Sequence, residues 1–183
     1  MKKTLVLDLD ETLIYSSINP GHSPDFIETI GSSTIYVKYR PYLMKFLSEM
    51  KAIYELILYT GGNKGYADSV LAHIEIDQAI FEHVLYHDQC VSQQGEYLIK
   101  YLGMLKGNRR NEDIVVVDNS LLNFCNSICN LVPIVEFNDT SQNDDALIRL
   151  GFYLKELCHE EDIRLRIKDD IASFLICKRV DYS

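Results

Sequence analysis

The sequence predicts an α/β fold with one doubly wound parallel sheet. Short apolar segments alternate with segments of helical periodicity along the chain. Three of the apolar segments, at residues 5–7, 54–59 and 114–117, run directly into polar residues. Buried parallel strands read as continuous apolar runs, and ligands bind at their carboxyl ends. We therefore expect a single domain, residues 1–183, with one site at that edge of the sheet.

The composition restricts the partners. The net charge is −9 and no run of Lys or Arg forms a basic stripe, so we expect no nucleic-acid partner. No segment approaches the roughly 18 apolar residues that cross a membrane, so we expect no membrane partner either. Five cysteines without a C-x-x-C pair indicate reduced thiols, which we expect to be buried. The expected protein is a soluble monomer of the nucleus or the cytoplasm.

An insertion is predicted after the first strand, at residues 15–40. Residues 25–30 and 34–39 are β-like and are joined at Gly31, which indicates a small hairpin beside the site. Pro41 suits the first turn of a helix that extends to about Met50.

The alternation then continues to the end of the chain. Residues 54–59 predict a strand, residues 63–73 a helix and residues 82–86 a further strand, and the last two strands are expected at residues 114–117 and 133–137.

Two helices are expected after the last strand. Ser141 and Asp144 predict a capping box at the start of the first. Their apolar stripes are Leu147, Leu150, Leu154 and Leu157, and then Ile163, Ile167, Ile171 and Phe174.

Asp8 and Asp10 carry the strongest chemical signal. Residues at i and i+2 of a strand share a face, and these two carboxylates stand where the first strand meets solvent. Two close carboxylates repel each other unless a cation or a shared proton offsets their charge. Mg2+ fits this need because it prefers hard oxygen ligands and completes its shell with water and phosphate oxygens. The alternative is that residues 8–12 form an acidic turn that caps a helix.

Three further elements match this chemistry, and each has a simpler explanation. The Thr60 hydroxyl and the backbone N–H groups of Gly61 and Gly62 can hold phosphate oxygens, or the glycines only form a turn. Lys100 can neutralise a phosphate, or it is a solvated surface lysine. Asp118 and Asn119 can provide oxygen ligands at a strand end, or they favour a turn.

A family resemblance emerges from motifs that span nearly the whole chain. These are D-L-D-E-T-L, R-P, Y-A-D, Y-L-I-K, V-D-N-S and F-N-D-T-S. Together they resemble the haloacid dehalogenase superfamily, and within it the small phosphatases of the RNA polymerase II C-terminal domain, the NLI-interacting-factor-like family. The resemblance implies a Rossmann-like fold of the haloacid dehalogenase type without a large cap. It also implies a Mg2+ cofactor and a phosphorylated protein segment as partner, such as the RNA polymerase II C-terminal domain.

The resemblance also implies roles for individual residues. Asp8 is the implied nucleophile and Asp10 the implied general acid and base. The implied metal set is Asp8, Asp10 and Asn119 with Asp118 in support, and the implied phosphate-binding set is Thr60, Gly61 and Lys100.

The implied substrate contacts are Thr12, Tyr66 and His87, of which Tyr66 matches a groove-lining tyrosine and His87 stands where relatives place an Arg. The insertion is shorter than is usual in the family, but its apolar residues can form a pocket for a proline. These apolar residues are Ile18, Ile30 and Ile35.

Three functions remain open at this point. The resemblance favours hydrolysis of phosphoserine, or of phosphothreonine, in an extended peptide through a phospho-aspartate. A small-molecule phosphatase of the same superfamily usually needs a larger cap, for which the intervals between motifs leave little chain. A non-catalytic binding module of this fold would not need the complete set of Asp8, Asp10, Lys100 and Asn119.

Overall fold

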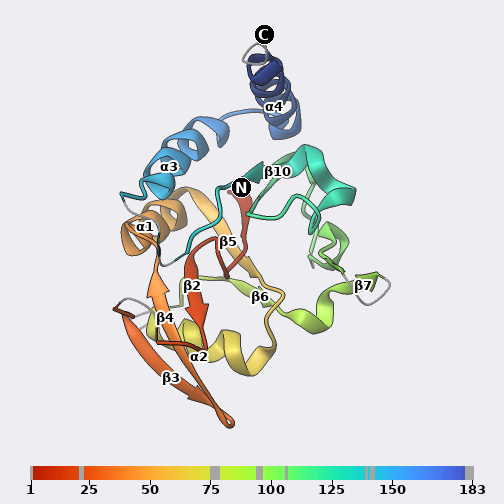
Figure 1. Ribbon diagram of the computed structural model, residues 1–183. Coiled ribbons are helices and arrows are strands. Elements are labelled where there is room, and N and C mark those ends of the chain that lie inside the picture. The colour runs from red at the N-terminus through yellow and green to blue at the C-terminus, as the bar shows by residue number, and fades with distance from the viewer. Residues whose placement is uncertain are drawn as a thin grey trace.

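The centre of the molecule is a five-stranded parallel sheet in the order β10-β9-β1-β5-β6 (Figure 1). The computed structural model describes residues 2–20, 23–74, 79–93, 97–105, 107–138, 140 and 143–179. The strands are β1 (Lys3–Leu7), β5 (Tyr54–Tyr59), β6 (His83–Leu85), β9 (Ile114–Asp118) and β10 (Leu131–Pro133). The predicted α/β fold with a doubly wound parallel sheet is confirmed.

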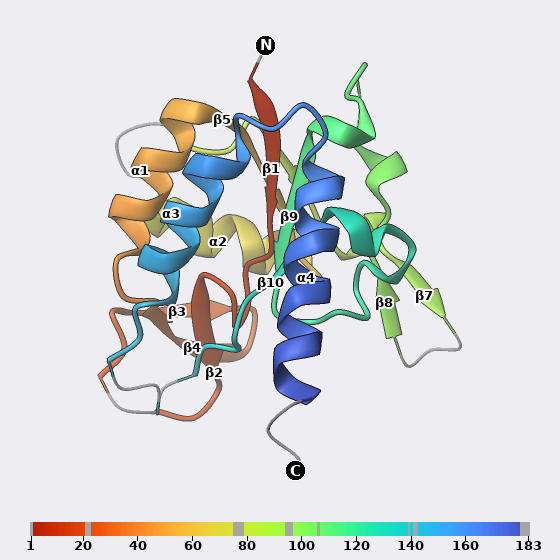
Figure 2. The ribbon, with the colours of Figure 1, turned by 90° about the horizontal axis from the view of Figure 1, so that it is seen from above.

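Side chains of the sheet alternate between two hydrophobic clusters, one on each face. In β1, Leu5 and Leu7 enter one cluster and Val6 enters the other. Helices α1 (Leu43–Ile53), α2 (Lys64–Ile74) and α3 (Ala146–Leu157) supply the first cluster, and Figure 2 shows α1 and α3 side by side on that face. Leu102 and Phe124 contribute to the second cluster. Leu102 begins the short 3-10 segment η2 (Leu102–Met104), and Phe124 directly precedes the 3-10 segment η4 (Cys125–Asn130). The remaining 3-10 segments are η1 (His87–Gln89) and η3 (Asn111–Asp113).

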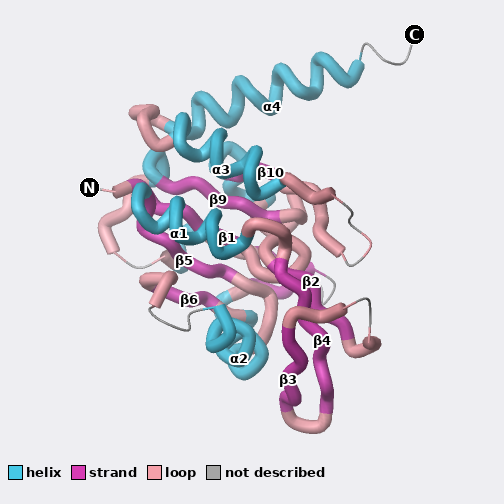
Figure 3. Tube along the Cα trace, turned by 90° about the vertical axis from the view of Figure 1, so that its left-hand side faces the viewer, coloured by secondary structure: helices cyan, strands magenta, loops and turns pink. Residues whose placement is uncertain are grey.

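The C-terminal helix α4 (Ile163–Arg179) reaches beyond the sheet, as Figure 3 shows. Its predicted stripe is confirmed for Ile163 and Ile167, which are buried in the first cluster, while the side chain of Phe174 lies outside the described residues. Ser141 of the predicted capping box also lies outside them, and the backbone N–H of Ala146 donates to Asp144 Oδ1 at 2.9 Å. Within the described part of the chain, no helix combines the length and apolar character needed to cross a membrane.

The insertion is a three-stranded antiparallel sheet beside α2 (Figure 3). Its order is β2-β4-β3, with β2 at Ile14–Ser17, β4 at Ser33–Tyr39 and β3 at Phe26–Ile30. The predicted hairpin is confirmed as β3 and β4. Strand β2 was not predicted, because its sequence Ile-Tyr-Ser-Ser lacks an apolar alternation. Phe26 stacks on His73 of α2 with ring centroids 3.9 Å apart, which fixes the insertion against the main domain.

Two other predictions are corrected by the structure. The last strand ends at Pro133 instead of spanning residues 133–137, because the chain beyond it leaves the sheet and Phe137 donates its backbone N–H to Glu11 O at 2.7 Å. Cys125 and Cys129 are exposed on η4 instead of buried. A hairpin of β7 (Val91–Gln93) and β8 (Tyr97–Ile99) was also missed, because strands of three residues are too short to show a periodicity.

Candidate active site

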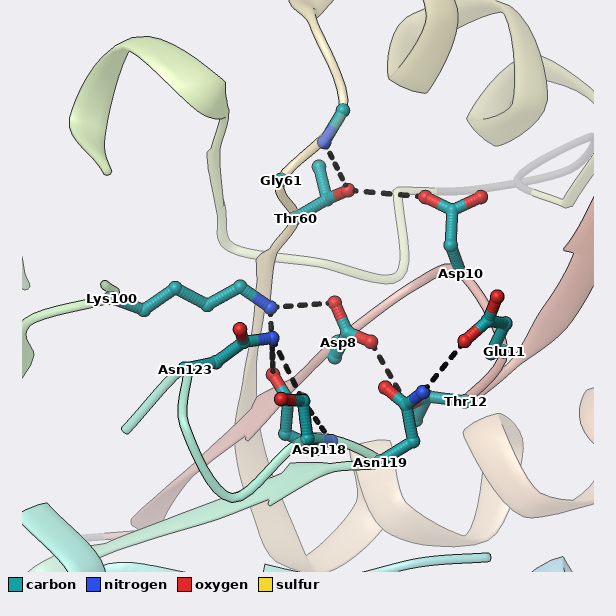
Figure 4. Close-up of polar contacts among 12 residues, drawn as sticks. Asp8, Asp10, Glu11, Thr12, Thr60, Gly61, Lys100, Asp118, Asn119 and Asn123 are labelled. Atoms are coloured by element: carbon teal, nitrogen blue, oxygen red, sulfur yellow. Dashed lines mark hydrogen bonds and ion pairs between the residues drawn. The ribbon is translucent and has the colours of Figure 1, made fainter. Parts of the chain in front are cut away.

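Three neighbouring strands deliver the predicted polar residues to one edge of the sheet (Figure 4). Asp8 follows β1, Thr60 follows β5, and Asp118 ends β9. The parallel register pairs Leu7 at the end of β1 with Leu58 of β5 and with Val117 of β9, so the three strand ends lie level with one another. This is the edge at which an open α/β sheet binds its ligand.

Asp8 is buried and both of its carboxylate oxygens are engaged. Lys100 Nζ lies 2.6 Å from Asp8 Oδ1, and Thr12 Oγ1 donates to Asp8 Oδ2 at 2.9 Å. Lys100 also reaches Asp118 Oδ2 at 2.7 Å, and its backbone N–H donates to Asn123 O at 2.7 Å. The ammonium therefore stands between two carboxylates, and the orientation of Asp8 is fixed from two sides.

Burial and the short distance between Asp8 and Lys100 determine the pKa values of these two groups. Burial raises the pKa of Asp8 above its ordinary value, and the Lys100 ammonium opposes that rise. Burial lowers the pKa of Lys100, but the carboxylates of Asp8 and Asp118 more than offset this and raise it above its usual range. Lys100 is therefore a permanent cation beside Asp8.

Asp118 is fully buried, and its contacts are those of a residue that supports the lysine. Besides Lys100, it accepts hydrogen bonds from the Ser120 backbone N–H at 2.8 Å and from Asn123 Nδ2 at 3.0 Å. Because these donors surround its carboxylate, Asp118 holds Lys100 in place. The sequence did not identify Asn123, which belongs to no motif.

The Asp10 carboxylate points toward a group of hydroxyls and not toward Asp8. Tyr66 Oη donates to Asp10 Oδ1, Ser16 Oγ lies 3.3 Å from the same oxygen, and Thr60 Oγ1 lies 3.5 Å from Asp10 Oδ2. Burial raises the pKa of Asp10, and these hydroxyl donors oppose the rise. A carboxyl group whose pKa is raised in this way is suited to donate and accept a proton near neutral pH.

The predicted phosphate-binding loop follows β5. Thr60 is fully buried, and its Oγ1 accepts the backbone N–H of Gly62 at 2.9 Å. A Cβ added at Gly62 would lie 2.7 Å from a ring carbon of Tyr66, so a glycine is needed for Tyr66 to approach Asp10. His87 Nδ1 lies 3.1 Å from Gly61 O, which places the exposed imidazole on the same loop.

The donors at the site suit a hard cation. Among the described residues drawn in Figure 4, Asp8, Asp10, Glu11 and Asp118 contribute four carboxylates and Lys100 contributes one ammonium. Asn119 Nδ2 donates to Glu11 Oε2 at 2.9 Å. Among the described residues, no three His, Cys, Asp or Glu side chains are grouped to hold a metal ion by themselves. A cation here would therefore depend on the Asn119 amide oxygen as well as on carboxylates.

The remaining predicted substrate residues lie in different surroundings. Thr12 has no exposed surface, and its hydroxyl donates to Asp8. Ile35 is 9% exposed and belongs to the first cluster, and Ile30 is partly buried against that cluster. Ile18 is 73% exposed. A shared proline pocket of the three isoleucines remains a prediction.

Arg40 has a role that sequence reasoning missed, although its R-P motif was noted. The side chain is 1% exposed, and Nη1 donates to the carbonyl oxygen of Thr12 at 3.0 Å. Nη2 donates to Val135 O at 2.7 Å and to Asp144 Oδ2 at 2.9 Å. Arg40 thus connects the loop that carries Asp8 to the chain after β10 and to the start of α3.

Comparison with known proteins gives consistent matches. The family model described as NLI interacting factor-like phosphatase matches residues 3–164. A CTD small phosphatase-like protein 2 of Dictyostelium discoideum is 34% identical over 92% of this chain, and a human CTD small phosphatase-like protein is 32% identical over 88%. This chain spans 30% and 58% of the lengths of these two relatives. The solved structure of Fcp1, an essential RNA polymerase II CTD phosphatase, shares the fold with a TM-score of 0.73 at 21% identity, covering 91% of this chain and 69% of the other.

Proposed function

The chain belongs to the NLI interacting factor-like phosphatase family, and from this membership and the geometry of its site we propose that it is a Mg2+-dependent protein phosphatase that hydrolyses phosphoserine. One observation carries the proposal. Asp8 is a buried carboxylate held at a strand end by Lys100 and Thr12, with a second carboxyl group, Asp10, in the same loop. This is the arrangement that a nucleophile and its general acid require.

In the first chemical step, a carboxylate oxygen of Asp8 attacks phosphorus in line with the departing serine oxygen. Asp10 donates the proton on its Oδ2, the oxygen nearer Thr60, to that serine oxygen. The bond between phosphorus and the serine oxygen breaks, and a phospho-aspartate forms on Asp8. The Lys100 ammonium balances the negative charge that develops, and the Thr60 loop holds the phosphoryl oxygens.

In the second step, the ionised Asp10 takes a proton from a water molecule that attacks the phosphoryl group on Asp8. The bond between phosphorus and the aspartate oxygen breaks, which releases phosphate and restores Asp8. Asp10 recovers its proton and is ready for the next substrate. The same carboxyl group thus acts as acid and then as base, which its raised pKa permits.

The proposed Mg2+ would be held by oxygens of Asp8, Asp10 and Asn119, with Asp118 supporting them through Lys100. When bound, it supplies positive charge opposite the phosphoryl oxygens. The fit rests on the excess of carboxylates over ammonium groups and on the oxygen character of the donors.

The proposed substrate is an extended phosphopeptide, such as the C-terminal domain of RNA polymerase II, encountered in the nucleus. The inserted sheet is small, so the site stays open to a peptide lying across its rim, whereas small ligands gain affinity from an enclosing pocket. Proline beside the phosphoserine would reduce the ordering entropy lost on binding. Both relatives described above are called CTD small phosphatase-like.

The substrate class is tested by comparing kcat/KM for a phosphoserine-proline peptide, a sugar phosphate and an aryl phosphate, all with Mg2+. The peptide should exceed the sugar phosphate, and a preference for the sugar phosphate would instead support a small-molecule phosphatase. Hydrolysis of none of the three would leave a binding module as the better account.

The proposed apolar contact with the peptide is tested by substitutions in the insertion. Ile18→Asp is preferable to Ile35→Asp, because Ile18 is exposed whereas Ile35 belongs to the core. Ile18→Asp should lower kcat/KM for the peptide and leave the aryl phosphate unchanged. Ile27→Asp, at another exposed isoleucine of the insertion, is the matched control. Equal losses for the two variants would mean that Ile18 does not recognise the peptide.

A further inference from the structure

Glu11 and Asn119 are joined by a hydrogen bond between two loops of the site (Figure 4). Asn119 Nδ2 donates to Glu11 Oε2 at 2.9 Å. Because an ionised carboxylate only accepts and an amide nitrogen only donates, this hydrogen bond fixes the orientation of the Asn119 side-chain amide. The amide oxygen, which is the atom that a hard cation would bind, is therefore turned away from Glu11.

The backbone of Glu11 is held in an unusual conformation. Its φ is 61°, in the left-handed region that favours glycine. Two hydrogen bonds keep it there: its N–H donates to Ile14 O at 2.7 Å, and its carbonyl oxygen accepts the N–H of Phe137 at 2.7 Å. A glycine would adopt this turn without strain, so the turn itself does not require the glutamate side chain. The side chain can therefore be removed without opposing the backbone conformation.

The bond also changes the amide as a ligand. Donation of Nδ2 to a negative carboxylate polarises the amide and increases the electron density on its oxygen. Without Glu11, the amide of Asn119 could rotate and present its N–H groups to a cation, which would repel them. A group that fixes the orientation of a metal ligand typically changes metal affinity by about 10–100-fold.

We propose that Glu11 is a positioning residue for the metal site, which holds the Asn119 amide with its oxygen available to Mg2+. This inference rests on the proposed function, because it presumes that Asp8, Asp10 and Asn119 bind Mg2+. It gives Glu11 a role apart from the chemistry of Asp8 and Asp10, since its carboxylate acts through the Asn119 amide.

The test measures Mg2+ binding to the full chain by calorimetry, without substrate, and repeats the titration with Mn2+ by electron paramagnetic resonance. Glu11→Gly removes the acceptor and suits the backbone, and it should weaken Mg2+ binding by about tenfold or more. Glu11→Gln keeps an oxygen acceptor of the same reach and should retain most of the affinity. Glu11→Asn, whose side chain is too short to reach Asn119, replaces Glu11→Gly if a metal-free melting curve shows that the glycine variant does not fold.

A matched control separates amide orientation from general charge. Glu136 is exposed and interacts electrostatically with Glu11, so Glu136→Gln removes a nearby negative charge without touching Asn119. It should bind Mg2+ like the parent. The proposal is overturned if Glu11→Gly binds like the parent, or if Glu11→Gln loses as much as Glu11→Gly. A parent that binds no Mg2+ would overturn the metal-dependent function as well, whereas a Mg2+-binding parent with an unaffected glycine variant would overturn only the role of Glu11.

Discussion

Arg40 and Asp144 form a buried ion pair, with Nη2 2.9 Å from Oδ2, although 104 positions separate them in the chain. The same guanidinium donates to Thr12 O, the residue whose hydroxyl holds Asp8. The pair therefore links the stability of the C-terminal helices to the position of the nucleophile. A single arginine suits this position because its planar group has five donors and stays charged when buried.

Loss of Arg40 should destabilise the whole fold. Arg40→Met leaves the Asp144 carboxylate and two backbone carbonyl groups without their donor, and removal of one partner of a buried pair costs about 3–5 kcal/mol. The free energy of unfolding, measured with urea, should fall by that amount. Arg149→Met is the matched control, because Arg149 pairs with Asp145 at the surface of the same helix start and such pairs contribute about 0–1 kcal/mol. Equal changes in the two variants would contradict the anchoring role of Arg40.

Tyr66 should act on the rate of the chemical step more than on substrate binding. Tyr66→Phe removes the hydroxyl that donates to Asp10, and a hydrogen bond to a charged group contributes about 1.5–3 kcal/mol. We expect kcat to fall by about tenfold or more with little change in KM. Tyr153→Phe, which removes a hydroxyl bonded to Asp170, should leave both constants unchanged. If KM rises while kcat is kept, Tyr66 lines the substrate groove, as the family resemblance implies.

Metal removal should abolish hydrolysis reversibly. Excess chelator should remove activity, and added Mg2+ should restore it, because the site has a surplus of carboxylates and hard oxygen donors. Zn2+ should not replace Mg2+, since the motifs bring no His or Cys ligand to Asp8. Activity that persists in chelator, or that only Zn2+ restores, would show that the proposed site is wrong.

Much of the site was predictable because buried parallel strands have a plain sequence signature. Apolar runs that end at Asp8, Thr60 and Asp118 gave the sheet, its active edge and most of the polar residues there. Lys100 follows the three-residue strand β8, which lies outside this sheet, and the family motif Y-L-I-K supported a position that alone could be a surface lysine.

The remaining contacts depend on long-range geometry that local patterns do not encode. Ser16 meets Asp10 because of the register of β2, a strand without an apolar pattern. The chain after β10 was predicted as strand from its apolar residues, yet Phe137 bonds to the loop of Glu11 instead. The side-chain orientation of Asp10, toward Tyr66 instead of Asp8, likewise depends on side-chain packing beyond its own motif.

The most direct test of the central claim is whether a phosphoryl group is transferred to Asp8. The Asp10→Asn variant should slow both chemical steps, because it lacks the acid and the base, and should keep phosphate binding. We expect acid quenching of this variant during reaction with an aryl phosphate and Mg2+ to trap the intermediate, because an aryl oxide leaves without a proton from Asp10 whereas the attacking water needs the missing base. Peptide mass spectrometry should then find one added phosphoryl group on Asp8, and Asp8→Asn should carry none and show no turnover. Phosphorylation at another residue, or turnover of Asp8→Asn within a few-fold of the parent, would contradict the account.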